Sequence, residues 1–484
     1  MIWSKYQSNI FDAYDNTRKN LAVEATAGSS KSTVLVECCK RTPPGKKFLF
    51  MAFNKSISEE LKLKVPQSVE VGTFHSKGLK VLLYNFKFRM KLVENKGFKI
   101  ALQNLVLDDL PAKIHMRYLF EIQAIWDFCR TNLLVGNDYD IQWVCLEKEI
   151  EYRDRMVDDI YIISREWERR ASRISGSKDF EMDFTDMLYL PYILLEEKDF
   201  PKYDVVAIDE AQDINTLQRE LILRYVKPRF GRLLSVGDFS QTIYSFQGAS
   251  RSNFKSLQQM DNTLVLPLSI SYRCAKAIVD EANKVFPGSI EASPSAEQGL
   301  IKVGDLKEAK EGDFVLCRNN LPLVEAFIFF LEQHKKATIK GKDFGDALCA
   351  LIERIEEIED LQRIKDQKLD DLMQKGISKS MAMNNAAYIA LEEKCAIINR
   401  LYCVWSNMKV LKEQIERIFT EETEGIILST IHKSKGLEAD RVFFLNQNLI
   451  PSAYAKTEDA LYSENCLKFV AITRAKKELI YCTI

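Results

Sequence analysis

The chain has 484 residues, of which 46% are hydrophobic and 28% are charged, and its formal net charge is −1. This length and apolar content exclude a disordered or fibrous protein and suffice for roughly two to four domains with cores of their own. A net charge close to zero gives no overall signal for nucleic acid, so binding to nucleic acid would have to come from local patches.

The cysteines and the amino-terminal residues indicate a reducing compartment. The sequence contains eleven cysteines and four histidines, and no two cysteines form a CxxC pair. The spacing typical of a zinc site is therefore absent. Because the first residues lack the pattern of a signal peptide, and no apolar run is long enough to span a bilayer, we expect a cytoplasmic or host-cell intracellular protein without a membrane partner.

Short apolar runs recur along the chain, and each leads into a loop and then into a helix-like pattern. Continuous apolar strands that alternate with helices are typical of parallel sheets covered on both faces. In such sheets, ligands bind at the carboxyl ends of the strands. The predicted strands include residues 22–25, 48–51, 205–208, 233–236, 314–317, 426–430, 442–445 and 479–482.

Two charged stretches with a helical period, residues 86–180 and 341–420, interrupt this alternation. The pattern predicts an α/β protein with two domains built on parallel sheets, each carrying a helical insertion. The first domain would comprise residues 1–85 and 181–265, and the second would comprise residues 266–340 and 421–484.

A segment of small residues between a predicted strand and a predicted helix resembles a phosphate-binding loop. Its backbone N–H groups would surround the phosphates, Lys31 would reach the terminal phosphates, and the Ser32 hydroxyl would hold Mg²⁺. Ala25 and Ser30 stand where glycines are expected, so a helix capped by small residues is the alternative interpretation. The candidate nucleotide-binding residues here are Ala25, Ala27, Gly28, Ser29, Ser30, Lys31, Ser32 and Thr33.

An acidic pair, Asp209 and Glu210, follows the predicted strand at 205–208. A carboxylate at a strand end is typical of ATP hydrolases, in which one acid binds Mg²⁺ and the next orients the attacking water. The alternative is a solvated acidic turn. With a phosphate-binding loop upstream, the pair favours an enzyme that hydrolyses ATP with Mg²⁺ at Ser32 and Asp209.

Nine segments of the chain, in order, are similar to motifs of one enzyme family. The long segment GDFSQTIYSFQGA at 237–249 is the most specific of them, and the segment DEAQD at 209–213 matches its motif at every position. Together the segments resemble the UvrD/PcrA-like superfamily 1 DNA helicases, and especially their F-box DNA helicase branch. The nine segments are residues 6–7, 51–56, 72–76, 183–187, 209–213, 237–249, 268–274, 430–438 and 470–475.

This resemblance implies two RecA-like domains of the P-loop NTPase type and a set of roles in ATP hydrolysis. Gln7 and Tyr272 would hold adenine, and Glu438 would contact the ribose. Gln241 would sense the γ-phosphate. Arg273 and Arg474 would act as arginine fingers, whose planar guanidinium groups stabilise charge on the transferred phosphate.

The resemblance also implies a single-stranded DNA track. The expected function is an ATP-dependent translocase and helicase that moves 3′→5′ in repair, recombination or replication. It would act on single strands and on junctions of single- and double-stranded DNA, with single-strand-binding or repair proteins as partners. Stacking and backbone contacts would make binding tolerant of sequence and sensitive to salt. The candidate DNA-binding residues are Asn54, Thr73, Phe74, His75, Tyr244, Phe246, Thr430 and His432.

Several positions depart from the family pattern. Ser30 replaces the glycine before Lys31, and a serine would be strained there if the position requires a positive φ. Ser271 replaces an asparagine, Phe246 replaces a tryptophan, and only Glu464 remains of an acidic pair before residues 470–475. The departure at Ser30 leaves open a nucleotide-gated clamp with weak turnover. A helicase that acts on RNA and another kind of P-loop enzyme are further alternatives.

Overall fold

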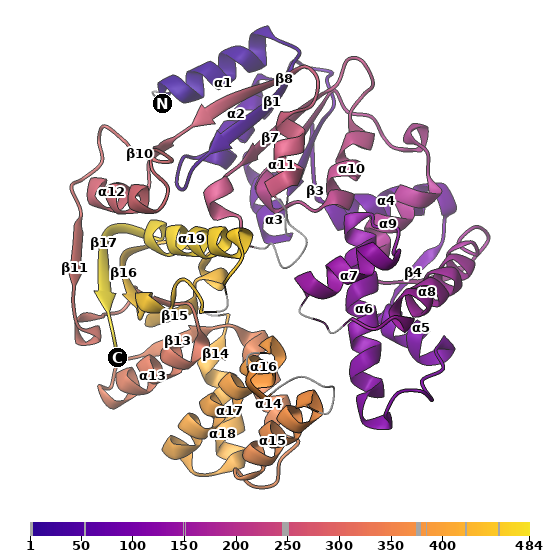
Figure 1. Ribbon diagram of the computed structural model, residues 1–484. Coiled ribbons are helices and arrows are strands. Elements are labelled where there is room, and N and C mark those ends of the chain that lie inside the picture. The colour runs from indigo at the N-terminus through magenta and orange to yellow at the C-terminus, as the bar shows by residue number, and fades with distance from the viewer. Residues whose placement is uncertain are drawn as a thin grey trace. The chain divides into compact units, whose positions relative to one another are not determined.

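The computed structural model describes residues 3–52, 55–148, 150, 152–243, 251–373, 379–383, 385–421, 424–453 and 455–484. The chain divides into two compact units (Figure 1). The first unit comprises Met1–Thr26 and Ser30–Ser269, and the second comprises Ala27–Ser29 and Ile270–Ile484. Both units contain a parallel sheet with helices, which confirms the predicted α/β class. Among the described residues, no helix combines the length and the apolar character needed to cross a membrane.

The sheet of the first unit has six strands in the order β3-β2-β6-β7-β1-β8. Every neighbouring pair in it is parallel, so the carboxyl ends of all six strands lie along the same edge. The strands are β1 (Asn20–Ala25), β2 (Phe48–Ala52), β3 (Val69–Thr73), β6 (Val205–Ile208), β7 (Arg232–Gly237) and β8 (Thr263–Leu268).

Successive residues of these strands point to opposite faces of the sheet and enter different cores. In β2, Phe48 and Phe50 pack in one core, whereas Leu49 and Met51 pack in the other. The first core is closed by α1 (Lys5–Asn16) and α2 (Lys31–Arg41). Burial on both faces explains why β2 and β6 are continuous apolar runs. The second core is closed by α4 (Phe74–Phe86), α9 (Asp186–Leu194), α10 (Thr216–Tyr225) and α11 (Arg251–Gln258).

A helical region between α4 and α9 has its own hydrophobic core (Figure 1, purple). One of its amphipathic helices, α8 (Arg155–Ala171), buries Met156, Ile160, Ile163 and Trp167, which recur at helical spacing. The short strands β4 (Arg89–Leu92) and β5 (Asp179–Met182) pair where the chain enters and leaves this region. The other helices are α5 (Lys96–Asn104), α6 (His115–Asn132) and α7 (Asp138–Glu147), and α3 (Lys55–Lys64) lies earlier in the chain.

The sheet of the second unit has seven parallel strands in the order β11-β17-β16-β12-β15-β13-β14. Its three central strands, β16, β12 and β15, are almost wholly buried. The strands are β11 (Leu300–Val303), β12 (Phe314–Cys317), β13 (Ala337–Lys340), β14 (Phe419–Thr420), β15 (Ile426–Thr430), β16 (Ala439–Leu445) and β17 (Ala475–Cys482). A separate two-stranded ladder joins β9 (Ile270–Ser271) to β10 (Glu291–Ala292).

The helices of the second unit fall into two groups. Those that flank the sheet along the chain are α12 (Lys276–Val285), α13 (Asn320–Glu332) and α19 (Glu458–Thr473). Between β13 and β14 lie α14 (Lys342–Ile352), α15 (Asp360–Met373), α16 (Lys379–Met383), α17 (Ala386–Trp405) and α18 (Met408–Ile418). One continuous core joins α13 and the sheet to α14, α17 and α18.

Candidate active site

The phosphate-binding segment connects the end of β1 to the start of α2, at the carboxyl edge of the first sheet. Gly28 has a φ of 70°, and Ser30 is left-handed with φ 65° and ψ 40°. The serine thus occupies a conformation that normally favours glycine. This is the positive φ at which a serine in place of the family glycine is expected to be strained. Its side chain makes no capping hydrogen bond. The backbone N–H groups at the start of α2 and the helix dipole suit this turn to a phosphate.

The structure brings the phosphate-binding loop and the acidic pair together. The Ser32 hydroxyl donates to Oδ2 of Asp209 at 2.6 Å, although the two residues are 177 positions apart in the sequence. Nζ of Lys31 lies 3.7 Å from Oε1 of Glu210. The two ends meet because β1 and β6 belong to the same parallel sheet and both end at its carboxyl edge.

The electrostatics of this cluster favour a cation. Burial, and then the charge of neighbouring Glu210, raise the pKa of Asp209 from 3.8 to about 6. Burial likewise raises the pKa of Asp238, although Lys31 and a hydrogen bond from Gln241 oppose the rise. The carboxylate and hydroxyl oxygens of Asp209 and Ser32 are ligands that Mg²⁺ prefers, and a divalent cation would compensate the buried negative charge. The residues present therefore fit Mg²⁺.

A glutamine that the sequence analysis did not single out, Gln212, links the acidic pair to Asp238, the residue that follows β7. Nε2 of Gln212 donates to Oε2 of Glu210 at 2.7 Å, and its Oε1 accepts the Asp238 backbone N–H at 2.8 Å. Nε2 of Gln241 in turn donates to Oδ2 of Asp238 at 2.5 Å. Glu210 itself is held at φ 53°. The signal that could have identified Gln212 is its position in the segment DEAQD. A buried amide among carboxylates must form hydrogen bonds with them.

Gln7 lies in the first turn of α1 and is 4% exposed. Its side-chain oxygen accepts the Ser4 backbone N–H at 3.0 Å, and its own N–H donates to the Ser4 hydroxyl at 3.2 Å. This capping box fixes the side chain at the start of the helix. Gln7 thus has a structural role beside the adenine-binding role expected for it.

The residues expected along the DNA track of the first unit have different environments. Thr73 caps α4 by accepting the Ser76 N–H at 3.2 Å. Phe74 is 3% exposed and packs in the second core, so its ring offers no surface for a base. The ring of His75 lies 6.0 Å from that of Phe184, edge to face, and burial lowers the pKa of His75. Asn54, Tyr244 and Phe246 lie outside the described residues.

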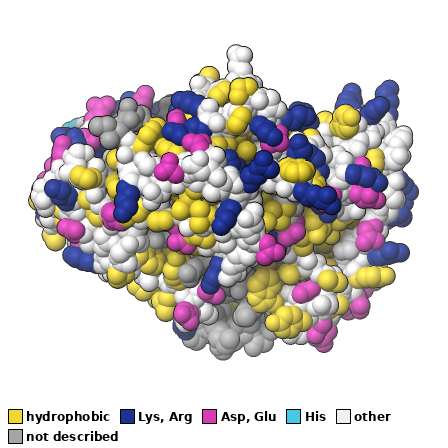
Figure 2. All heavy atoms as spheres, turned by 90° about the horizontal axis from the view of Figure 1, so that it is seen from above, with side chains coloured by type: hydrophobic (Ala, Val, Ile, Leu, Met, Phe, Trp, Pro, Cys, Tyr) yellow, Lys and Arg dark blue, Asp and Glu magenta, His cyan; other side chains and the backbone are white. Residues whose placement is uncertain are grey.

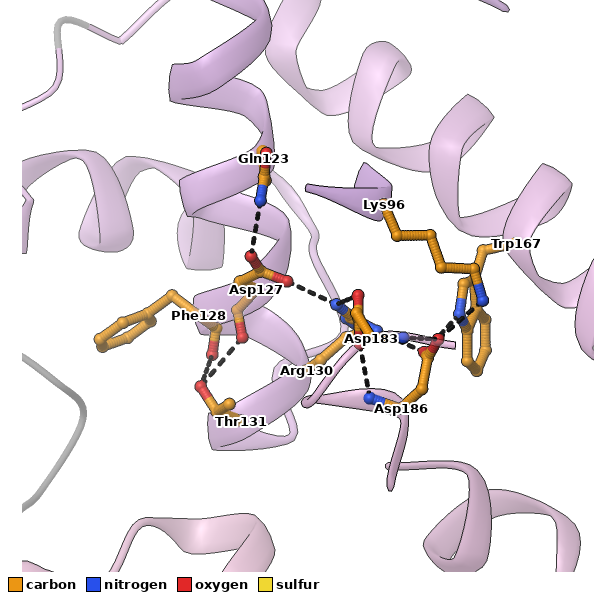
Figure 3. Close-up of polar contacts among 9 residues, drawn as sticks. All are labelled: Lys96, Gln123, Asp127, Phe128, Arg130, Thr131, Trp167, Asp183 and Asp186. Carbon is orange, nitrogen blue, oxygen red and sulfur yellow. Dashed lines mark hydrogen bonds and ion pairs between the residues drawn. The ribbon is translucent and has the colours of Figure 1, made fainter. Parts of the chain in front are cut away.

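The motif at 183–187 anchors the helical region to α9 through buried charges (Figure 3). Asp186 is fully buried and accepts from Lys96 at 2.7 Å, from Arg130 at 2.7 Å and from the Trp167 indole at 2.8 Å. Arg130 also contacts Asp183 at 2.9 Å. Salt bridges buried to this degree make the loss of one partner costly.

In the second unit, three charged side chains form a chain of ion pairs. Nε of Arg273 pairs with Oε2 of Glu438, and Oε1 of Glu438 pairs with Nζ of Lys476 at 2.9 Å. Burial alone would raise the pKa of Glu438, but the hydrogen bond from Lys476 and the charge of Arg273 lower it. Tyr272, beside Arg273, is 45% exposed. Its neighbour Ser271 is fully buried, and its hydroxyl accepts the Cys274 N–H at 3.3 Å.

Arg474 follows α19 directly and is 1% exposed. Its guanidinium donates to the carbonyls of Val470 and Leu437, both at 3.1 Å, so the group lies against the carboxyl end of the helix. Glu464, the acid that remains from the family pair, accepts from Nη2 of Arg318 at 2.6 Å.

Two candidate DNA-binding residues of the second unit lie at the end of a buried strand and in the turn directly after it. Thr430 ends β15, and His432 begins a short 3-10 turn, His432–Ser434. Burial, and then the charge of Arg318, lower the pKa of His432 to about 4. The imidazole is therefore neutral at physiological pH and can contact a strand only by hydrogen bonding or packing.

Comparison with known proteins assigns the chain to a family. Residues 6–261 match the UvrD/REP helicase N-terminal domain, and residues 329–484 match the UvrD-like helicase C-terminal domain. The chain therefore belongs to the UvrD-like helicases, and its two parallel sheets are the two RecA-like domains of that family. This confirms the resemblance inferred from the nine motifs.

The curated relatives share little sequence with the chain. F-box DNA helicase protein 1 of Schizosaccharomyces pombe is 24% identical, over 98% of this chain and 56% of that protein. F-box DNA helicase 1 of Gallus gallus is 22% identical, over 95% of this chain and 47% of that protein. ATP-dependent DNA helicase Rep of Escherichia coli is 26% identical, over 54% of this chain and 40% of that protein. The chain spans about half the length of the two F-box relatives.

Proposed function

We propose that the protein is an ATP-dependent DNA helicase that translocates on single-stranded DNA. The observation that carries this proposal is the contact of Ser32 with Asp209 beside the pair of Lys31 with Glu210, at the edge of a parallel sheet. This is the set of groups that ATP hydrolysis requires: a cation for the phosphates, oxygen ligands for Mg²⁺, and a carboxylate for the attacking water.

In the first unit, each group has one task in this proposal. The loop from Ala27 to Thr33 cradles the phosphates through its backbone N–H groups, and Lys31 contacts the terminal phosphates. Ser32 and Asp209 would hold Mg²⁺, which when bound neutralises charge on the β- and γ-phosphates. Glu210 accepts a proton from the attacking water, and Gln212 keeps its carboxylate oriented by the hydrogen bond at 2.7 Å.

Gln241 would respond to the γ-phosphate from its position beside Asp238. In the second unit, we propose that Arg273 and Arg474 act as arginine fingers, with Tyr272 stacking on adenine and Glu438 binding the ribose. Arg273 is paired with Glu438 and Arg474 with backbone carbonyls. When a nucleotide binds, each guanidinium would exchange these partners for phosphate oxygens. It would therefore stabilise charge on the transferred phosphate only in the nucleotide-bound state.

For the DNA track, we propose Asn54, Thr73, His75, Tyr244, Phe246, Thr430 and His432, and we exclude the buried ring of Phe74. The low pKa of both histidines favours neutral contacts to the strand rather than ion pairs with phosphates. Binding should therefore be tolerant of sequence, and its salt dependence should come from lysines and arginines elsewhere.

We also propose the direction of movement, the preferred DNA substrate and the domain boundaries. Movement 3′→5′, action at junctions of single- and double-stranded DNA, and a role in repair, recombination or replication follow from family likeness alone. The division into motor cores at 1–85 with 181–265 and at 266–340 with 421–484 follows instead from the alternation of strands and helices along the sequence. The helical regions at 86–180 and 341–420 would be insertions. The core that joins α13 to α14, α17 and α18 supports an insertion packed on its own motor domain.

ATP hydrolysis by the purified protein, with and without oligothymidylate or polyuridylate, tests the proposal beside the Glu210→Gln variant. We expect stimulation by oligothymidylate that is lost in Glu210→Gln while nucleotide binding persists. Stimulation by polyuridylate alone would replace DNA by RNA as the track. A directional unwinding assay with 3′- and 5′-tailed duplexes then tests the polarity.

The left-handed Ser30 favours one second candidate, a nucleotide-gated clamp with weak turnover. Strain in the loop that holds the phosphates would lower the population competent for hydrolysis. The presence of Glu210, Gln241, Arg273 and Arg474 argues against it. Measurable DNA-stimulated turnover of the unsubstituted protein would exclude the clamp.

A further inference from the structure

The amino edge of the first sheet, opposite the phosphate-binding loop, carries a concentration of positive charge. Three segments that lead into β1, β2 and β7, residues 18–19, 40–47 and 227–232, contain nine Lys and Arg and no Asp or Glu. The whole chain has a formal net charge of −1, so this concentration is local. Figure 2 shows Lys and Arg side chains gathered among apolar groups on the face that is seen from above. We call these nine side chains the amino-edge basic surface.

Strand order brings the three segments together. The strands β2, β6, β7 and β1 are successive neighbours in a parallel sheet, so the residues that precede them lie along one edge. One hollow of about 680 Å³ is lined by all three segments, with Arg18, Lys46 and Arg232 among its lining residues. This edge is separated from Ser32 and Asp209 by the length of the strands. The surface therefore lies outside the candidate ATP site.

Few of these cations are neutralised by the protein itself. Arg41 pairs with two carboxylates, and the nearer is that of Asp15 at 2.7 Å. Lys46 and Lys227 share one carboxylate, that of Asp204, at 3.4 Å each. Within the described part of the chain, the other six cations form no ion pair with a carboxylate, and they are Arg18, Lys19, Lys40, Lys47, Arg229 and Arg232. The surface therefore keeps an excess of positive charge that a polyanion would neutralise.

Arg232 is held in a position that suits it to an anion. Its guanidinium carbon lies 3.7 Å from the centroid of the Tyr14 ring, and its Nη1 donates to the Thr17 carbonyl at 2.9 Å. These two contacts fix the planar group, but the hydrogen bond uses only one of its five N–H donors. Because Arg232 is partly exposed and lines the hollow, phosphate oxygens can reach its other donors.

An exposed aromatic ring lies within the basic surface. Phe230 is 62% exposed and lines the same hollow. The turn that carries it is closed by a hydrogen bond of 2.8 Å from the Gly231 N–H to the Lys227 carbonyl, and Arg229 in this turn has a left-handed φ of 65°. The ring is thus presented on a defined turn among cations. Any base can stack on such a ring while its phosphates contact the cations, because every base has a π face.

We propose that the amino-edge basic surface binds a second segment of single-stranded nucleic acid, separate from the DNA track proposed above. Phosphates of this segment contact Arg18, Arg229 and Arg232, and one base stacks on Phe230. The strands β2 and β1 are three strand spacings of about 4.8 Å apart, roughly 14 Å in all, so the surface meets several successive phosphates. This binding goes beyond ATP hydrolysis and does not depend on it.

A single strand fits this surface better than a duplex or an acidic peptide does. The hollow of about 680 Å³ is of the size that small ligands occupy, so it admits one nucleotide of a single strand but not a duplex. The bases of a duplex are also already stacked on one another. A peptide of Asp and Glu would match the charge but offers no flat ring to the exposed face of Phe230.

Crosslinking to the full-length protein locates the strand. A short oligothymidylate that carries 4-thiothymidine is irradiated with the protein in the absence of ATP, and the crosslinked peptides are identified by mass spectrometry. We expect a crosslink within residues 227–232, at Phe230. The proposed track would give crosslinks in other peptides, and no hydrolysis is involved, so a failure of the proposed helicase activity leaves this result unaffected. Crosslinks confined to other parts of the chain, or no crosslink at all, would overturn the proposal.

A double variant, Arg18→Gln with Arg229→Gln, tests the contacts to phosphate. At about 0.1 M salt, one phosphate contact contributes about fivefold to the affinity for a single strand, because the salt slope is about −0.7 for each contact. The oligomer concentration for half-maximal crosslinking at Phe230 should therefore rise roughly 25-fold, and the salt slope should fall by about 1.4.

The matched control is Arg173→Gln with Arg354→Gln. These arginines are also exposed and form no ion pair within the described part of the chain. The control variant should leave the crosslink at Phe230 unchanged. An equal loss in both double variants, or no loss in the variant of the basic surface, would count against the proposal.

Unlabelled competitors define the ligand. Oligothymidylate should displace the crosslinked strand at a lower concentration than a duplex with the same number of phosphates or a polyglutamate of the same charge. Equal competition by oligouridylate would support the surface as one for single strands of either sugar. A duplex or a polyglutamate that competes as well as oligothymidylate would show that charge alone is recognised, and it would overturn the assignment to a single strand.

Discussion

Replacing Ser30 by glycine tests the strain in the phosphate-binding loop. Ser30 is held at φ 65° and ψ 40°, where a residue with a Cβ atom costs roughly 1–2 kcal/mol. Its side chain makes no capping hydrogen bond, so glycine removes no contact of that kind. Glycine also increases the entropy of the unfolded chain, which lowers the free energy of unfolding by roughly 0.4–1 kcal/mol and so offsets part of the gain from relieved strain. We expect the free energy of unfolding to rise by about 0.5–1 kcal/mol, or about 2 °C in melting temperature.

Thermal unfolding followed by circular dichroism measures this difference, and Ser30→Ala is the matched control. Alanine keeps the Cβ atom that causes the strain and removes only the hydroxyl, so its melting temperature should not rise. If Ser30→Ala gained as much stability as Ser30→Gly, the hydroxyl and not the backbone would be responsible. If Ser30→Gly lost stability, the left-handed conformation would not be strained, and the structural basis of the clamp hypothesis would disappear.

Three further predictions concern the buried charges. Asp186→Ala leaves Lys96 and Arg130 buried without their shared partner and should destabilise the first unit by about 3–5 kcal/mol in urea unfolding, whereas Asp179→Ala, at an exposed pair with Arg89, should cost less than about 1 kcal/mol. Because the folded pKa of Asp209 is raised to about 6, the folded protein binds a proton that the unfolded chain releases between pH 4 and pH 6. Stability without metal should therefore fall as pH rises through this window, and a flat profile would show that the carboxyl group is not perturbed. Mg²⁺-dependent nucleotide binding should weaken about tenfold for each pH unit below 6 as the proton competes for the carboxylate, and a titration that Asp209→Asn leaves unchanged would contradict this.

Much of the fold could be predicted because the inner strands are buried on both faces. A strand of that kind is a continuous apolar run, and β1, β2, β6, β7, β12, β15, β16 and β17 were all recognised in this way. The strands β3, β8, β11 and β13 were missed. They are partly exposed, and β8, an edge strand, contains Pro267, so their apolar signal is weak.

The family, the class of fold and the chemistry of the phosphate-binding loop could be inferred from the sequence alone, because they depend on residue types at fixed local spacing. The left-handed conformation of Ser30, the burial of Phe74 in the core and the link from Glu210 through Gln212 to Asp238 are evident only in the folded protein. Each of these depends on groups far apart in the chain, whose meeting is set by strand order and packing and leaves no periodic trace in the sequence.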